Sequence, residues 1–350
     1  MMSSTPVHVR ALACFTPVLF AATAAAPDAD RLSTDYTRRV VFTTERAETF
    51  EFETTSFQML VDGEEIQGRG GMGGGGSTRE TRIVQRDRIL EDDGAAPVRV
   101  QRTYEAVEGE AEEMRRGEPQ DRTLESSFDG AVLELALDDG GVVIDVVEGD
   151  AEPKSPDLFG LALSVDLLLP AEEVEEGSAW DVDGDVLLKA MGLDLDSELF
   201  TAPEREADGE RRGRGPGGGG FGRGRGAATP WSTFNELDWT VELTLQSVDE
   251  DGVATIVIEA EGSGEPSAPE DGGGRFGASE VSGSIEAVLE GALEFSIESE
   301  HPVSLRVEGD FSIERNSVRE AGDRTIETEI VQEGEFACRM LFEMEELEED

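Results

Sequence analysis

The sequence has little of the two residue types on which most metal and redox chemistry depends. Its 350 residues include only two cysteines, Cys14 and Cys338, and two histidines, His8 and His301. Zinc hydrolysis needs two or three His or Cys ligands, so a zinc enzyme is nearly excluded. A Ser-His-Asp site is not indicated either, because His301 precedes Pro302 at an expected turn and no nucleophile elbow lies near it. We therefore predict no catalytic residue, no cofactor and no enzyme activity.

Positive charge is also scarce. The chain has 29 Lys and Arg against 79 Asp and Glu, which gives a formal net charge of -50. Phosphate contacts need clustered Lys and Arg, so we predict no nucleic-acid partner and no docking on anionic lipid surfaces. The Arg- and Gly-rich stretch from Arg211 to Arg225 resembles an RNA-binding box, but we interpret it as a flexible basic loop in an acidic protein. The acidity itself fits a solvated surface, with adaptation to salt and binding of cations as alternatives.

Long apolar runs are missing, and the one apolar stretch at the N-terminus reads as a signal peptide over residues 1–24. Arg10 precedes an apolar stretch from Ala11 to Ala22, and small residues follow up to Ala24. Pro17 and the shortness of the run argue against a retained membrane helix, and no later segment reaches the ~18 apolar residues that a spanning helix needs. We therefore predict a protein exported to the periplasm or the medium that does not span a membrane.

Cleavage of this segment determines which thiols the mature protein keeps. A lipoprotein signal at Cys14 is rejected, because cleavage there leaves the apolar stretch from Phe15 as the new N-terminus. Removal of residues 1–24 leaves Cys338 as the one cysteine, so no intramolecular disulfide can form. Cys338 falls on the apolar parity of its segment and is expected to be a buried small hydrophobe rather than a reactive thiol.

Two-residue alternation of apolar and polar side chains is the dominant pattern and predicts strands with one wet face. It is clearest in residues 303–314, where odd positions are apolar apart from Gly309 and every even position is polar. Residues 285–297 and 336–344 alternate in the same way, and Gly291 is expected to mark a bend or bulge in the first of these. The pattern predicts a mainly β protein of curved antiparallel sheets.

Two predicted hairpins resemble one another and suggest two related halves. In the first, residues 132–137 and 142–147 flank an Asp-Asp-Gly-Gly turn, and in the second, residues 239–245 and 253–258 flank a turn ending at Gly252. Asp-Gly between alternating runs is a strong hairpin signal. We predict antiparallel β halves over residues 31–200 and 231–350, joined by a Gly/Arg-rich flexible linker over 201–230.

Helical patterns are few. Apolar residues at helical spacing predict a helix over 157–169, bracketed by Pro156 and Pro170, and the sheet should cover it because it is apolar on nearly all sides. A second short helix is expected over 186–191, ending at Gly192. Three Gly-rich inserts predict mobile loops: Gly68 to Gly76, Gly213 to Gly226 and Gly272 to Gly277.

One acidic loop could bind a metal ion. Asp181, Asp183 and Asp185 occupy alternate positions and could offer oxygen ligands to calcium. The bidentate Glu that follows in calcium-binding loops is missing, since Glu198 is too distant. A polar strand end and turn is the simpler interpretation, and these residues are weak candidates.

The order of features resembles a loose group of bacterial exported proteins. The segment Leu168 to Trp180 carries the resemblance, with Leu-Pro, a valine and Gly-x-x-Trp as its core. These proteins look similar to periplasmic lipoprotein carriers of the Lol type, in which a curved antiparallel half-barrel wraps an apolar helix and leaves an apolar cavity. The resemblance implies such a fold here, although this chain has two β halves where a carrier has one.

We therefore expect a non-catalytic envelope or secreted protein that holds an apolar small molecule, a lipid or a partner segment against a concave β face. Candidate lining residues lie on apolar parities: Trp239, Leu243, Phe295 and Phe311. Two alternatives stay open, a secreted hydrolase with paired carboxylates and a calcium-dependent structural or adhesive module.

Overall fold

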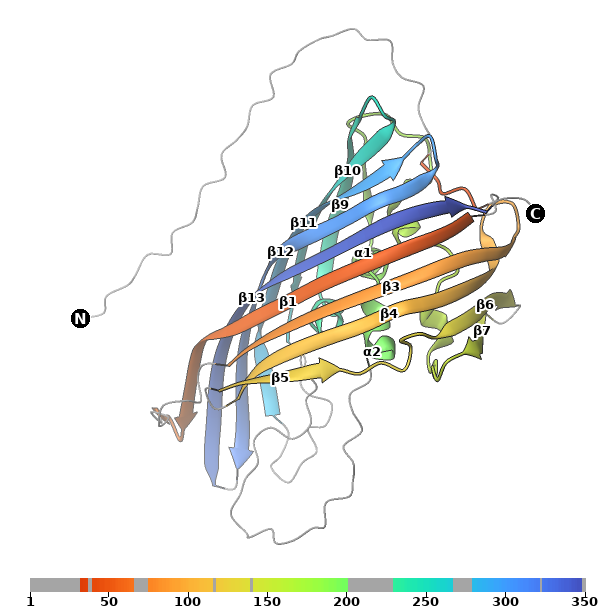
Figure 1. The fold of residues 1–350 in the computed structure, drawn as a ribbon. Helices are drawn as coiled ribbons and strands as arrows, with labels where there is room; N and C mark the ends of the chain where they lie inside the picture. Colours follow the sequence, from red (N-terminus) through yellow and green to blue (C-terminus); the bar gives the residue numbers. More distant parts are fainter. Residues whose placement is uncertain are drawn as a thin grey trace.

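The computed structural model describes residues 32–36, 40–65, 75–115, 118–138, 141–200, 229–266, 279–321 and 323–347. Thirteen strands in this part of the chain form one antiparallel sheet, which is curved and not closed (Figure 1). The strands are β1 (Val40–Val61), β2 (Glu64–Glu65), β3 (Gly76–Asp92), β4 (Pro97–Arg115), β5 (Glu118–Leu124), β6 (Val132–Asp138), β7 (Gly141–Glu148), β8 (Ala179–Val182), β9 (Asp238–Val248), β10 (Val253–Gly264), β11 (Ser279–Ser296), β12 (His301–Ala321) and β13 (Arg324–Glu346). The predicted fold class, mainly β with a curved antiparallel sheet, is confirmed.

The first and last long strands meet in the middle of the sheet. The strand order is β7-β6-β4-β3-β1-β13-β12-β11-β10-β9-β8, and β2 and β5 pair with β1 and β4 off this path. β1 pairs with β13 from Val40↔Glu346 to Val61↔Ile326. The chain therefore runs outward from β1 to one edge, crosses to the opposite edge at β8, and returns strand by strand to β13.

The alternation seen in the sequence places one side-chain row on the buried face. In β13, Phe336, Cys338, Met340 and Phe342 are buried, while Ala337, Arg339 and Leu341 are exposed. The predicted strand over 303–314 is confirmed within β12, and that over 285–297 is confirmed in β11 up to Ser296, both with the expected parity. The burial of Cys338, which raises the pKa of its thiol to about 12, agrees with its expected role as a small hydrophobe.

The strand has no bulge at Gly291, where the sequence predicted a bend or bulge. The register of β11 against β12 shifts between Glu294 and Phe295, whereas Gly291 pairs regularly with Val307. A Cβ atom at Gly291 would lie 2.3 Å from the carbonyl oxygen of Arg306. Glycine is required here because the neighbouring backbone approaches closely, not because the strand gains a residue.

Both predicted hairpins are present, and both belong to the one sheet. β6 pairs with β7 through Asp138↔Gly141, and β9 pairs with β10 through Val248↔Ala254. The halves over 31–200 and 231–350 share this sheet through the β1–β13 pairing, and their relation as copies stays a prediction. The signal peptide, residues 201–228 of the linker and most of the Gly-rich inserts lie outside the described residues.

The predicted helix over 157–169 is wrong. Residues 149–178 cross the buried face from β7 to β8 with two 3-10 turns, η1 (Pro156–Leu158) and η2 (Ser164–Leu168), and extended chain between them. Backbone hydrogen bonds within residues 157–169 are confined to these short turns, and between them the Leu163 N–H donates to the Tyr36 hydroxyl at 2.7 Å. The segment still lies against the sheet as expected, with Phe159, Val165 and Leu168 buried.

Short helices complete the layer over the buried face. They are α1 (Gly184–Ala190), η3 (Leu193–Leu195), α2 (Asp196–Leu199) and α3 (Pro230–Phe234). The helix expected over 186–191 corresponds to α1, and Gly192 follows it with a φ of 70°, as a helix stop requires. Among the described residues, none of the helices has the length and apolarity to span a membrane.

Two apolar clusters lie between the sheet and this layer. The larger joins strands β1 and β9 to β13 with η2, α1 and α3, and includes Phe50, Leu188 and Leu243. The smaller joins β3, β4 and β6 to residues 151–161 and α2, and includes Tyr104 and Phe159. Polar groups and a cavity separate the two clusters, and this region forms the candidate site.

Candidate functional site

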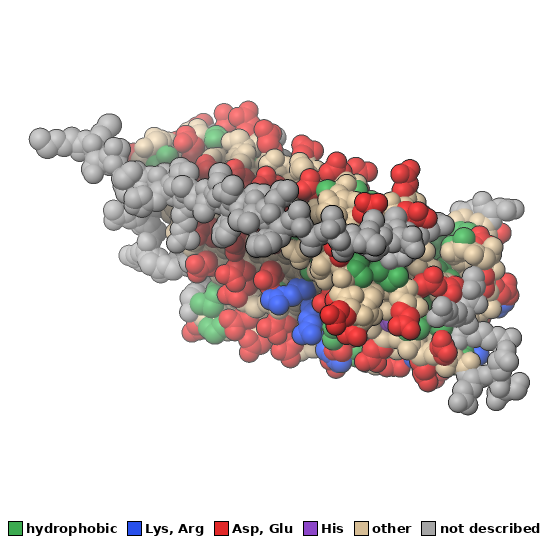
Figure 2. All heavy atoms as spheres, turned by 90° about the horizontal axis from the view of Figure 1, so that it is seen from above, with side chains coloured by type: hydrophobic (Ala, Val, Ile, Leu, Met, Phe, Trp, Pro, Cys, Tyr) green, Lys and Arg blue, Asp and Glu red, His purple; other side chains and the backbone are tan. Residues whose placement is uncertain are grey.

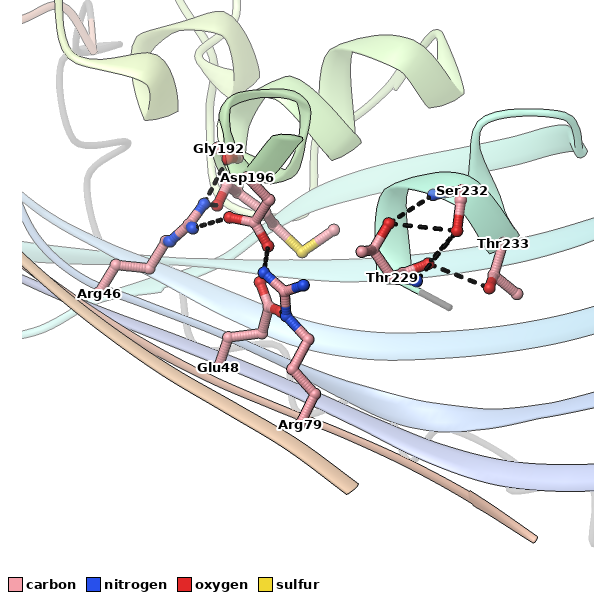
Figure 3. Close-up of polar contacts among 9 residues, drawn as sticks. Arg46, Glu48, Arg79, Gly192, Asp196, Thr229, Ser232 and Thr233 are labelled. Atoms are coloured by element: carbon pink, nitrogen blue, oxygen red, sulfur yellow. Dashed lines mark hydrogen bonds and ion pairs between the residues drawn. The ribbon is translucent and has the colours of Figure 1, made fainter. Parts of the chain in front are cut away.

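A group of buried charges ties β1 and β3 to the covering layer. Arg46 of β1 donates to the backbone oxygens of Met191 (3.1 Å) and Gly192 and to Asp196 at the start of α2, and Arg79 of β3 donates to the other Asp196 oxygen at 3.1 Å (Figure 3). The side chains of Arg46, Arg79 and Asp196 are 5%, 6% and 1% exposed. A carboxylate with two guanidinium partners is well compensated away from water, so Asp196 fixes α2 on the sheet.

Glu48 is the least satisfied member of this group. Its Oε1 lies 4.0 Å from Arg79 Nε, and neither carboxylate oxygen has a hydrogen-bond partner among the described residues. Burial and, secondly, the neighbouring Asp196 carboxylate raise the pKa of Glu48 to about 8, against the lowering effect of Arg46 and Arg79. Glu48 therefore keeps its proton to a higher pH than an exposed glutamate does.

A second anchor holds the crossing segment. Arg102 of β4 bonds both oxygens of Asp87 on β3 at 2.7 and 2.8 Å, and it also donates to the Gly160 carbonyl at 3.1 Å. Both side chains are nearly inaccessible. A paired guanidinium thus satisfies a backbone oxygen in the extended stretch between η1 and η2.

Further polar contacts fix the two ends of the same segment. Thr34 donates to Asp166 in η2 at 2.6 Å, and Tyr36 donates to the other oxygen of this carboxylate. Burial raises the pKa of Asp166 to about 6, against the lowering effect of these two donors. At the other end, Glu198 of α2 accepts hydrogen bonds from the backbone N–H groups of Lys154 and Ser155.

A cavity of about 440 Å³ lies between the anchored segment and the sheet. Its sheet side includes Thr44, Arg46, Ile83, Gln85, Arg102 and Met340, and its opposite side consists mainly of leucines and small residues between Leu158 and Leu199. Both guanidinium groups of the floor are paired with carboxylates, so they bring little uncompensated charge to the space. A cavity of this size with apolar walls and a few fixed polar groups suits a small apolar or amphipathic ligand.

The mouth of the cavity has an apolar and a cationic side chain. Leu167 of η2 is 50% exposed, although Val165 and Leu168 of the same turn are buried. Lys189 of α1 also borders the cavity, and its nearest acidic partner is Asp185 at 3.9 Å, with both side chains largely exposed. An entering molecule therefore meets an apolar surface with one weakly paired cation beside it.

The ligand-lining candidates from the sequence lie in the larger apolar cluster instead. Leu243, Phe295 and Phe311 are buried, and Trp239 is half-buried with its Nε1 donating to the Phe234 carbonyl at 2.9 Å. None of the four lines the cavity beneath the crossing segment. Phe311 stacks on Phe50 with ring centroids 4.9 Å apart, and it also lines a separate cavity of about 560 Å³ along β1, β11, β12 and β13.

The residues of the actual cavity floor escaped the sequence analysis, although the sequence has a signal for them. Arg46 stands at the same parity as Phe42 and Phe50 in β1, and Arg102 lies between Val100 and Tyr104 in β4. A charged residue on the apolar parity of a strand must find a buried partner. That pattern alone does not reveal which partner, since Asp196 is 150 residues from Arg46.

The calcium candidates Asp181, Asp183 and Asp185 are exposed around the start of α1. Within the described ranges, no group of three or more His, Cys, Asp or Glu side chains is arranged to hold a metal ion. Asp183 precedes α1 as its N-cap residue, without a side-chain capping bond. The structure thus places Asp181 near the end of β8, Asp183 at the helix N-cap and Asp185 in the first turn of α1.

Comparisons with known proteins provide no family. No protein-family model matches the chain, and no curated protein matches it. Among solved structures, a match was found to the InvG secretin domain β-barrel from the Salmonella SPI-1 injectisome NC-base, with 8% sequence identity and a TM-score of 0.18. The match covers 89% of this chain and 64% of that one, so this chain spans less than two thirds of its length. No functional argument follows from a TM-score this low, and the resemblance to lipoprotein carriers is not confirmed by these comparisons.

Proposed function

We propose that this chain is a non-catalytic exported protein that holds an apolar or amphipathic small molecule in the cavity beneath residues 157–167. The cavity of about 440 Å³ between leucine-rich chain and curved sheet is the observation that supports it. Ligand pockets of folded proteins have volumes of roughly 300–1,000 Å³ and are mainly apolar with a few placed polar groups. The predicted signal peptide supports export, and the net charge of -50 supports solubility of a carrier in water.

The covering segment has the construction that ligand entry needs. Residues 159–163 lack regular secondary structure and are held at separate points, by Arg102 of β4 at Gly160 and by Tyr36, which precedes β1, at Leu163. Irregular chain held by a few polar contacts opens locally at lower cost than a helix with a continuous hydrogen-bond ladder. Opening between these points gives a ligand a way past Leu167.

A titration with a neutral fluorescent probe tests this function. The mature protein is titrated with N-phenyl-1-naphthylamine, whose emission rises in apolar surroundings, and we expect saturable binding at one site. Ala162 lines the cavity and is half-buried, so Ala162→Phe should fill the space and weaken binding at least tenfold. Ala337→Phe is the matched control, because it adds the same side chain at an exposed position on the other face of β13.

The two variants also separate blocked binding from lost folding. Both should melt cooperatively, within a few degrees of the parent protein, as followed by circular dichroism. Equal probe binding by Ala162→Phe and the parent protein would place the probe elsewhere and refute this cavity as the site. No saturable binding by the parent protein would argue against the proposed function itself.

A further inference from the structure

The strand β7 forms one outer edge of the sheet. β7 pairs with β6 on one side and is the last strand of the sheet on the other. Among the described residues, no hydrogen bond reaches its outer side. η1 lies near the Gly141 end, where a Cβ atom would come 3.6 Å from Asp157, so the open stretch runs from Val143 to Glu148. Figure 1 shows the β6–β7 hairpin at this margin of the sheet.

Apolar side chains flank this edge on both faces of the sheet. Val143, Val146 and Val147 are 46%, 40% and 57% exposed, and Leu137 of the paired strand is 59% exposed. Val146 pairs with the buried Leu133 and therefore lies on the buried-face side of the sheet. Val143 pairs with Ala136 and lies on the opposite face. A strand with β-branched residues at five of its eight positions is well suited to extend the sheet and poorly suited to stay in water.

Other outer strands of the same molecule are protected, which makes β7 stand out. β8 has only four residues, and Ala179 and Asp181 among them are exposed. β5, which pairs only with β4, contains Pro119, Asp121 and Arg122. Short length, proline and charge are the usual devices that prevent strand addition. β7 has eight residues, no proline, and only Asp145 as a charge before its last residue, Glu148.

We propose that the outer edge of β7 is a docking site for an extended apolar segment of another protein that carries lysine or arginine and adds to the sheet as a further strand. Main-chain hydrogen bonds supply affinity in this mode, and alternate side chains supply specificity. The charge of the hairpin favours a basic partner. Its acidic residues are Glu134, Asp138, Asp145 and Glu148, and Arg99 nearby already pairs with Glu134. A second copy of this chain brings the same acidic hairpin and the same large negative charge, so a basic segment fits better.

A synthetic peptide with alternating lysine and valine, eight residues long, is the probe. Fluorescence anisotropy of the labelled peptide with the mature protein in 0.15 M salt should show saturable one-to-one binding. The same peptide with N-methylated valines should bind at least tenfold more weakly, because it lacks half of its main-chain donors. A version with glutamate in place of lysine should not bind.

Two exposed valines give matched variants for the position of the site. Val143→Lys adds a positive charge at the β7 edge and should weaken peptide binding at least tenfold. Val288→Lys adds the same charge in β11, an interior strand where the valine is 49% exposed, and should change the affinity less than twofold. Hydrogen exchange should slow at the amides of residues 143–147 when the peptide binds.

Three results would overturn the proposal. Equal binding of the N-methylated peptide would mean that the acidic surface attracts the peptide without strand addition. Equal loss in Val143→Lys and Val288→Lys would mean that β7 is not the site. A concentration-dependent dimer in sedimentation that Val143→Lys abolishes would mean that a second copy occupies the edge.

Discussion

Arg102 donates to the Gly160 carbonyl at 3.1 Å, and this contact joins β4 to the extended chain that covers the sheet. The guanidinium can serve there because Asp87 neutralises it at 2.7 and 2.8 Å. The cavity lies between such contacts. Its shape therefore depends on buried ion pairs as much as on the leucines that line it.

Loss of the Arg102 partner should destabilise the protein strongly. Asp87→Asn leaves a buried guanidinium with a neutral partner, and we expect the free energy of unfolding to fall by about 3–5 kcal/mol. Glu345→Gln is the control, because it breaks the exposed Arg86–Glu345 pair (2.9 Å) and should cost less than about 1 kcal/mol. Urea unfolding measures both, and equal effects would contradict the role of Arg102 as an anchor.

The stability of the protein should fall as pH rises through the folded-state pKa of Glu48. That pKa is raised to about 8 from 4.5, so the folded state holds a proton that the unfolded state releases. The contribution is complete below pH 4.5 and is lost between there and pH 8, at up to about 1.4 kcal/mol per pH unit. Glu48→Gln removes this linkage. Its melting temperature relative to the parent protein should rise from pH 5 to pH 8 and then level off.

Measurement of the difference between Glu48→Gln and the parent protein removes the general effect of the acidic surface. Asp166, whose pKa is raised to about 6, changes both proteins in the same direction and cancels. A difference in melting temperature that is constant from pH 5 to pH 8 would show that Glu48 is ionised in the folded protein.

Five carboxylates lie directly opposite one another across neighbouring strands on the outer face of the sheet. The register places Glu308, Glu290, Glu259, Glu242 and Asp181 in one row from β12 to β8, and all five are exposed. Figure 2 shows how acidic side chains dominate the face that it views, with few Lys and Arg. Like charges at directly opposed positions destabilise a sheet.

Replacement of the middle carboxylate should therefore stabilise the protein. Glu259→Lys places a cation between Glu242 and Glu290, and we expect a gain of about 0.5–1 kcal/mol at low salt. The gain should shrink in 0.5 M NaCl, where the Debye length is only a few Å. Urea unfolding at both salt concentrations checks this, and a loss of stability would mean that the row binds a cation that the lysine displaces.

Trp239 should be sensitive to small changes beside it. It lies between Gly184 and Gly262, where added Cβ atoms would come within 2.4 and 2.8 Å of its side chain. Gly262→Ala forces the indole to move and should cost about 1–3 kcal/mol. Gly160→Ala, with its nearest atom at 3.7 Å, should cost much less. Equal costs in urea unfolding would contradict this close packing.

Sequence patterns predicted the strands well where one face of the sheet is wet. The alternation over 303–314 shows which residues face the core, and the Asp-Gly turns show which residues pair across a hairpin. Both signals depend only on residues close together in the sequence. The segment over 157–169 failed for the opposite reason. Its leucines fit helical spacing, but partners far away in sequence, Tyr36 and Arg102, take its backbone groups.

The site was less predictable than the fold. Arg46 and Arg102 can be singled out as charges on an apolar parity, yet their partners depend on the pairing of β1 with β13 and on the path of residues 149–200. The four aromatic and aliphatic candidates, Trp239, Leu243, Phe295 and Phe311, were chosen for apolarity, and apolarity does not distinguish packed core from cavity wall. Only the three-dimensional arrangement separates the two.

The central claim, that the cavity beneath residues 157–167 holds an apolar or amphipathic molecule, is tested most directly by native mass spectrometry of protein purified from the cell's periplasm or medium. The account predicts a bound species of defined mass in the parent protein and in Ala337→Phe, and its absence in Ala162→Phe. The polypeptide mass alone in all three proteins, together with no saturable uptake of the neutral probe, would contradict it.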